Sequence, residues 1–125
     1  MRKHTAIILA GAMLAAAAGA PALAHHSYAM FDAQQNKQLD GTVSAFKWTN
    51  PHSYIEVMVM DDKGQTQTWG VECGSPAQMV RAGWKSTSLK PGDHVVVTVH
   101  PLRDGTPGGS FVQVQTADGK VLKAS

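Results

Sequence analysis

From about residue 38 onward, short stretches of alternating apolar and polar residues follow one another along the chain. Apolar side chains occupy every second position, which is the period of a half-buried β-strand. Ile55, Val57 and Val59 illustrate such an inward-facing set. The predicted strands cover residues 38–47, 52–60, 65–73, 93–100 and 110–116, with a short sixth strand at 121–122. The pattern indicates a mainly β protein.

One segment between the third and fourth strands interrupts this alternation. Ser75 is a favourable N-cap, and Gln78 completes a capping box with it. Pro76 suits the first helical position, and Gly83 can end the helix at C′. These four residues predict one short helix over about 75–83.

Three strands, a helix and then a hairpin is the element order of an OB-fold, a small and partly open β-barrel. We therefore expect an OB-like barrel of five or six strands, with the helix between strands three and four. A small β-sandwich stays open as the alternative, because both architectures need the same inward stripe of apolar side chains. The barrel domain would span residues 38–125, after an N-terminal arm, residues 25–37, held by Tyr28 and Phe31.

The first 24 residues have the three parts of an export signal. A basic start with Arg2 and Lys3 is followed by an alanine-rich apolar run and by an A-x-A cleavage site at residues 22–24. The apolar run is shorter than the about 20 residues that span a membrane. We expect cleavage after Ala24, a periplasmic location and no membrane span.

Removing this segment changes the charge of the chain. The whole sequence has 11 Lys and Arg against 9 Asp and Glu, and loss of Arg2 and Lys3 leaves 9 against 9. The mature chain, 125 − 24 = 101 residues long, is then neutral apart from its histidines. Without a cluster of basic residues, attraction to phosphates is weak, so nucleic acid is not an expected partner.

Cys73 is the single cysteine, so no internal disulfide can form. It ends an alternating apolar stretch, which favours a buried thiol over a metal ligand. Met58 and Met60 alternate along the second strand, and thioethers suit Cu(I). Methionine more often fills irregular gaps in a core, so we expect both side chains to pack.

The proposed cleavage site places two histidines at the start of the mature chain. A first-residue histidine offers its α-amine and a ring nitrogen to one metal ion, and these donors suit Cu(II), Zn(II) or Ni(II). We therefore take His25 and His26 as candidate metal ligands, with copper as the first choice. The alternative is a disordered polar terminus that only follows the cleavage site.

His52 is the best candidate for a further ligand from the body of the protein. It follows Asn50-Pro51, where the chain passes from the first strand to the second, and it shares a face with Tyr54 and Glu56. Its alternative role is structural, as a hydrogen-bonding partner of the Asn50-Pro51 turn. His94 and His100 lie too far apart along one strand to share a metal.

No nucleophile motif, carboxylate pair or phosphate-binding loop is visible, so we expect a binding or accessory protein and not an enzyme. A metal-free module that binds an envelope component, a small organic ligand or a partner protein is the second hypothesis. Its contact candidates are the aromatic residues Trp48, Tyr54, Trp69 and Trp84.

Several motifs occur together in a recognisable order. They are His25-His26-Ser27-Tyr28, Gly41-Thr42-Val43, Trp48-Thr49-Asn50-Pro51-His52, Gly74-Ser75-Pro76, Arg81-Ala82-Gly83-Trp84 and Leu89-Lys90-Pro91-Gly92-Asp93. Together they resemble the domain-of-unknown-function 6152 family of small exported bacterial proteins. The resemblance implies a single-domain periplasmic protein and brings no catalytic residues with it.

Overall fold

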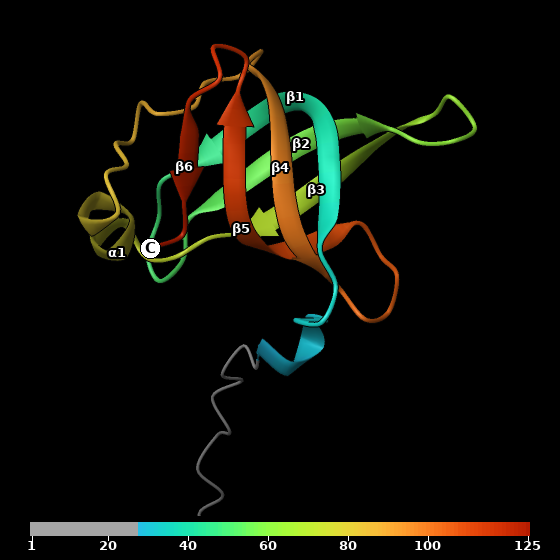
Figure 1. The fold of residues 1–125 in the computed structure, drawn as a ribbon, viewed down its shortest axis with the longest axis horizontal. Helices are drawn as coiled ribbons and strands as arrows, with labels where there is room; N and C mark the ends of the chain where they lie inside the picture. The colour runs from blue at the N-terminus through green and yellow to red at the C-terminus, as the bar shows by residue number, and fades with distance from the viewer. Residues whose placement is uncertain (1–27) are drawn as a thin grey trace, which may run out of the picture.

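The computed structural model describes residues 28–125, which form a β-barrel with one short α-helix (Figure 1). A single turn of 3-10 helix, Tyr28–Met30, precedes the first strand. The strands are β1 (Lys37–Lys47), β2 (Tyr54–Met60), β3 (Thr66–Glu72), β4 (His94–Pro101), β5 (Gly108–Thr116) and β6 (Val121–Lys123), and the helix α1 (Pro76–Arg81) lies between β3 and β4. This is the element order predicted from the pattern.

The strand pairings distinguish a barrel from a sandwich. The strands follow the order β3-β2-β1-β4-β5-β6, and a further parallel pairing joins β3 to β5. That pairing closes five strands into a ring, with β6 added antiparallel to β5. The remaining neighbours within the ring are antiparallel. The fold is thus an OB-like barrel, and the sandwich alternative was wrong.

β1 belongs to both halves of the barrel. Its first part pairs with β4 and its last part with β2, and Gly41 pairs with both, opposite Val59 on one side and Val95 on the other. A β-bulge follows between Val43 and Ala45. A bulge and a glycine let a strand bend sharply and turn a barrel corner, so one long strand can serve two faces.

The barrel interior holds the apolar stripe expected from the sequence. Ile55, Val57 and Val71 are fully buried, as are three alternating valines of β4. The full set of buried core residues is Leu39, Val43, Ile55, Val57, Trp69, Val71, Cys73, Met79, Trp84, Leu89, Val95, Val97, Val99, Phe111, Val114 and Leu122. Burial of this stripe away from water drives the closure of the barrel.

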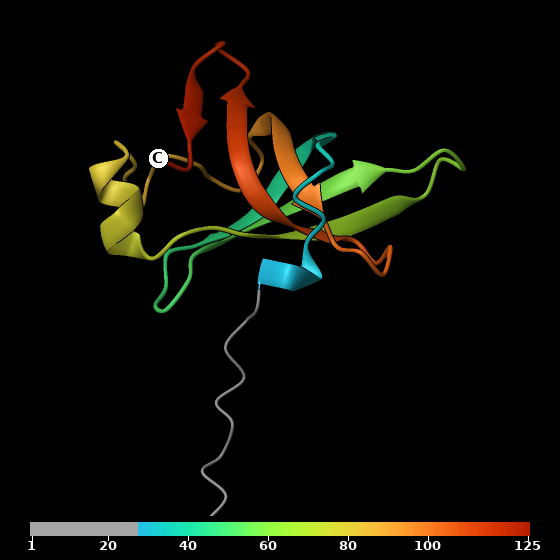
Figure 2. The same ribbon diagram turned by 60° about the horizontal axis from the view of Figure 1, so that its bottom comes forward.

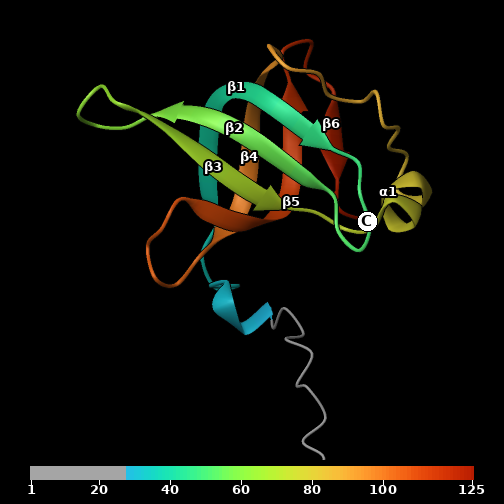
Figure 3. The same ribbon diagram turned by 180° about the vertical axis from the view of Figure 1, so that it is seen from behind.

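The two ends of the molecule differ. The turn of the β2–β3 hairpin projects from one end, whereas α1 lies at the other, beside the C-terminus and the loop that joins β1 to β2 (Figures 1 and 2). α1 begins with the predicted capping box of Ser75 and Gln78, and Gly83 follows its C-cap with a φ of 91°. The view from behind shows the ends of β2 and β3 that point toward α1 (Figure 3).

The N-terminal arm is held by one of its two expected anchors. Phe31 is buried and forms an isolated β-bridge with Leu102. Tyr28 was expected to act in the same way, but it is 64% exposed. The prediction for Tyr28 was wrong because the 3-10 turn that carries it lies outside the closed ring of strands.

Met58 and Met60 are also more exposed than expected. Their side chains lie on the outer face of β2, with Met60 70% exposed, so the prediction that both pack in a core was wrong. The inward positions of β2 belong to the alternate residues Ile55 and Val57, and within residues 28–125 the outer face stays exposed at this end of the strand.

Candidate functional site

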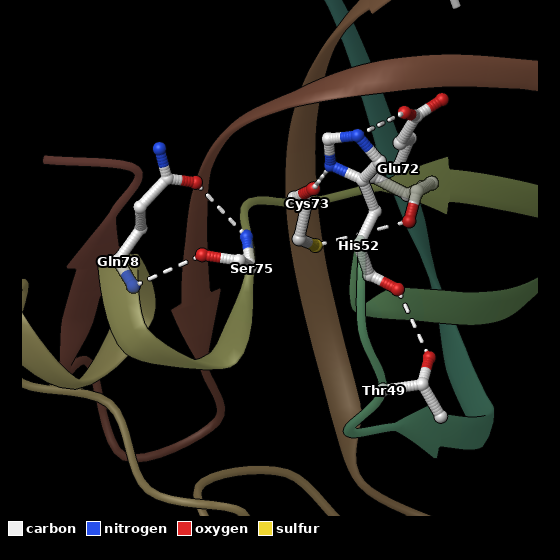
Figure 4. A network of polar contacts seen from close by, with 7 residues as sticks. Thr49, His52, Glu72, Cys73, Ser75 and Gln78 are labelled. Carbon is white, nitrogen blue, oxygen red and sulfur yellow. Dashed lines mark hydrogen bonds and ion pairs between the residues drawn. The ribbon is translucent and has the colours of Figure 1, made fainter. Parts of the chain in front are cut away.

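The residues at the α1 end of β2 and β3 form the candidate site, shown in Figure 4. Tyr54, the first residue of β2, pairs with Glu72, the last residue of β3. Two further backbone hydrogen bonds continue the ladder, because Ser53 donates to the Gly74 carbonyl and Cys73 donates to the Ser53 carbonyl. His52 therefore lies one diagonal step from Glu72 on the same face, a spacing that long side chains can bridge.

His52 makes defined contacts through both ring nitrogens. Nδ1 lies 3.2 Å from the backbone carbonyl oxygen of Cys73, and Nε2 lies 3.7 Å from Oε1 of Glu72 (Figure 4). A carbonyl oxygen can only accept a hydrogen bond, so Nδ1 must be the donor. Nε2 is therefore the ring nitrogen that faces the Glu72 carboxylate.

A side chain of the preceding loop holds the backbone of this histidine in place. Thr49 donates a hydrogen bond of 2.9 Å from its hydroxyl to the His52 carbonyl. The sequence-based alternative, in which the ring serves the Asn50-Pro51 turn, was wrong for the ring, because the ring contacts the end of β3. The backbone of His52 does take part in the turn, and His52 lies just before β2, which starts at Tyr54.

Glu72 is the residue that the sequence analysis did not select. Its side chain is only 9% exposed, and within residues 28–125 its one charged partner is His52. Buried carboxylates are normally paired and hydrogen-bonded, and a separation of 3.7 Å is too long for a direct hydrogen bond. Burial together with the negative charge of Glu72 raises the pKa of Tyr54. The site thus contains a largely buried carboxyl group that lines a pocket and whose recorded partner within residues 28–125 is the His52 ring, 3.7 Å away.

A pocket of about 470 Å³ opens beside this pair. Glu72 lines it together with Tyr28 from the N-terminal arm, Arg81 from α1 and Phe111 from β5. The pocket thus joins the carboxylate of the site to Tyr28, which follows His26 after one intervening residue.

The structure separates the other titratable candidates from this site. Glu56, on the same strand, forms an ion pair with Lys47. His94 forms an exposed pair with Asp40, and His100 contacts the backbone of Gln35. None of these side chains lines the pocket beside Glu72.

Within residues 28–125, no three or more His, Cys, Asp or Glu side chains form a cluster that could hold a metal ion. His25 and His26 lie outside the described residues, as does the predicted signal peptide. His52 and Glu72 are therefore two ligands at most, and a complete site needs more donors.

The aromatic contact candidates of the second hypothesis are mostly structural. Trp84 is 2% exposed in the core, whereas Trp69 is 8% exposed and lines a separate pocket with Lys37 and Arg103. Trp48 and Tyr54 are half-buried, and Trp48 packs edge-on against Phe46 with ring centroids 5.7 Å apart. In the pocket beside Glu72, the aromatic lining comes from Tyr28, which is exposed, and from Phe111, which is 7% exposed.

Cys73 is buried, as the sequence predicted, and its thiol is free. Burial raises the pKa of Cys73 to about 12, which disfavours the thiolate that metals and electrophiles require. We expect a thiol reagent at pH 8 to label the native protein at least about a hundredfold more slowly than the urea-unfolded protein. Equal labelling rates in the two states, measured by mass spectrometry, would contradict this assignment.

Fold and site together define a small OB-like barrel in which a half-buried histidine contacts a buried glutamate, and this glutamate lines a pocket at one end. The chain belongs to a family of unknown function (DUF6152), whose family model matches residues 12–112. This confirms the family resemblance seen in the sequence motifs.

Two other comparisons were made. A search of curated proteins found no match. Among solved structures, the chain is similar to the mitochondrial single-stranded DNA binding protein Rim1 from S. cerevisiae, with a TM-score of 0.49 and 13% sequence identity, over 69% of this chain and 97% of that chain. None of the helices in residues 28–125 is long and apolar enough to cross a membrane.

Proposed function

We propose that the mature protein is a periplasmic accessory protein that binds copper and catalyses no reaction. In this proposal, removal of the signal peptide after Ala24 exposes the α-amine of His25. That amine, the rings of His25 and His26, and the ring of His52 supply nitrogen ligands for Cu(II).

The arrangement of His52 is the observation that carries the proposal. Ligand histidines commonly donate the proton of one ring nitrogen to a backbone carbonyl, which fixes the ring and directs the other nitrogen at the metal. The contact of 3.2 Å between Nδ1 and the Cys73 carbonyl has this form, and it leaves Nε2 available as a ligand. A ring nitrogen held in this way supports a ligand role for His52.

The position of Tyr28 supports participation of the N-terminal histidines. Tyr28 lines the same pocket as Glu72, which neighbours His52. At no more than about 3.6 Å per residue, the Cα atom of His26 can lie at most ~7 Å from that of Tyr28, and the Cα atom of His25 at most ~11 Å. The short connection is compatible with both histidines reaching the pocket.

The test compares chains that differ only at their first residue. A chain that starts at His25 is expected to bind Cu(II) at least about tenfold more tightly than one with a single alanine added before His25, because the added residue removes the amine chelate. Titration calorimetry measures both affinities, and the intact mass of the exported protein establishes whether His25 is the first residue.

Two substitutions complete this test. His52→Ala should weaken Cu(II) binding, whereas the matched control His94→Ala should not, because His94 forms an exposed pair with Asp40 away from the site. The same affinity with and without the added alanine would exclude the amine-based site.

A metal-free binding module is the second candidate, and the pocket beside Glu72 favours it. Phe111 and Tyr28 offer aromatic surface there, and Arg81 offers a positive charge to a small organic anion, an envelope component or a partner protein. If protein purified from the periplasm contains no metal, and the His25→Ala variant has the same metal content as the wild type, this second function is preferred.

A further inference from the structure

We propose that His52 and Glu72 form a preformed pair of ligands for a divalent transition-metal ion, so that Glu72 supplies a carboxylate oxygen to the copper site and selects Cu(II) over Cu(I). The remaining ligands of the ion would come from the N-terminal arm, and for these ligands alone the inference rests on the proposed function. The pairing of His52 with Glu72 is a property of residues 28–125.

The first argument is the distance between the two donor atoms. Nε2 of His52 and Oε1 of Glu72 are 3.7 Å apart. Bonds of about 2.0–2.2 Å from one metal ion to an imidazole nitrogen and a carboxylate oxygen place these atoms ~2.9 Å apart at a right angle and ~3.4 Å apart at the tetrahedral angle. The observed distance is thus a few tenths of an ångström wider than a tetrahedral pair, which small side-chain rotations can close.

The second argument is the burial of the carboxylate. The Glu72 side chain is more than nine-tenths buried and, within residues 28–125, is paired only with His52. Removing a carboxylate from water is unfavourable unless a cation or several hydrogen-bond donors replace the water. Nε2 of His52 and Oε1 of Glu72 face each other across 3.7 Å, which is too far for a direct hydrogen bond, and a metal cation between them would contact both atoms.

The third argument concerns the oxidation state of the metal. Imidazole, amine and carboxylate donors suit borderline divalent ions such as Cu(II) and Zn(II), whereas Cu(I) prefers thioether and thiolate sulfur. The Cys73 thiol is buried in the core. Met58 and Met60 lie six and eight residues further along the chain than His52, so they are ~20 Å or more away at ~3.3 Å per residue.

The experiment uses the chain that starts at His25 and the variant Glu72→Gln, with Glu56→Gln as the matched control. Both substitutions remove one carboxylate from neighbouring strands, but Glu56 pairs with Lys47. Glu72→Gln is expected to weaken Cu(II) binding by about 10–100-fold. Loss of a residue that only hydrogen-bonds a metal ligand already has an effect of this size, so loss of a ligand should have at least the same effect. Glu56→Gln should leave the affinity within about twofold of the wild type.

A spectroscopic readout separates ligation from a structural effect. The electron paramagnetic resonance spectrum of bound Cu(II) should change in Glu72→Gln, because an oxygen donor is lost, and should stay unchanged in Glu56→Gln. Thermal unfolding of each apoprotein checks that the variants fold. Should Glu72→Gln fail to fold, Glu72→Asp, which withdraws the carboxylate by one methylene, takes its place and should bind Cu(II) more weakly.

The outcomes distinguish this inference from the proposed function. If the added N-terminal alanine weakens binding and Glu72→Gln changes neither affinity nor spectrum, Glu72 is not a ligand and the inference is overturned, while the amine-based site stands. If Glu72→Gln alone weakens binding, the His52–Glu72 pair stands and the amine-based site fails. If neither change has an effect, both are wrong.

Discussion

Trp84→Ala is expected to lower the free energy of unfolding by about 3–5 kcal/mol, the range for truncating a buried aromatic residue. Trp84 is 2% exposed and packs against Phe46 and Phe111, with ring centroids 5.8 Å and 5.4 Å away. Its indole Nε1 donates a hydrogen bond of 2.9 Å to the Lys123 carbonyl in β6. The substitution removes a side chain that links the segment after α1 to the interior and to the last strand.

Urea unfolding at 25 °C, followed by far-ultraviolet circular dichroism, measures this loss. Trp48→Ala is the matched control, because Trp48 is half-buried at the edge of the core and makes a single ring contact with Phe46. We expect its effect to be less than half that of Trp84→Ala. Equal destabilisation by the two substitutions would show that Trp84 is not a central packing residue.

Gly41→Ala is expected to destabilise the barrel by about 3 kcal/mol, at the upper end of the usual range for overpacking. A Cβ atom at this position would overlap the Met58 carbonyl oxygen and would lie 3.0 Å from a methyl carbon of Val57. Because Gly41 is paired on both sides, to β2 and to β4, neither neighbouring strand can move away without breaking its ladder.

The control for this substitution is Gly70→Ala in β3. An added Cβ there meets no atom within 4 Å, so the change should alter stability by no more than about 0.5–1 kcal/mol. Thermal unfolding of both variants gives the comparison. A Gly41→Ala protein as stable as Gly70→Ala would mean that the strands at the barrel corner are free to separate.

The local features of the fold could be predicted because they depend on neighbouring residues. The period-2 pattern predicted all six strands, with ends within a few residues of those observed. The capping box at Ser75 and Gln78 and the glycine after the helix also occur where expected. Each of these depends on backbone conformation and side-chain chemistry within about four residues of one another.

The candidate site was predicted only in part, because it depends on strand register. Within a single strand, the sequence placed His52 on the face of Tyr54 and Glu56, ~13 Å from Glu56. Its actual carboxylate neighbour is Glu72, 20 positions later, which the pairing of Tyr54 with Glu72 brings beside it. Pattern alone leaves the register between two strands open, because a shift of two residues keeps the same faces inward.

The exposed methionines and the buried tryptophans illustrate the same limit. Alternation placed Met58 and Met60 opposite the apolar stripe of β2, but whether another element covers that outer face depends on the closure of the barrel. Trp69 and Trp84 were named as contact candidates, yet their exposed fractions are only 8% and 2%. The burial of a strand's second face is a property of the assembled sheet.

By itself, the sequence determined the order of strands and helix, the alternation that makes one face of each strand apolar, and the helix caps, because these arise from interactions between near neighbours. Only the tertiary structure decided that β3 pairs with β5 to close a barrel, and that His52 meets a buried Glu72 beside the pocket that Tyr28 lines. The physical reason is that hydrogen-bond ladders and side-chain burial between distant segments are determined by the packing of the whole chain, which no single stretch of sequence specifies.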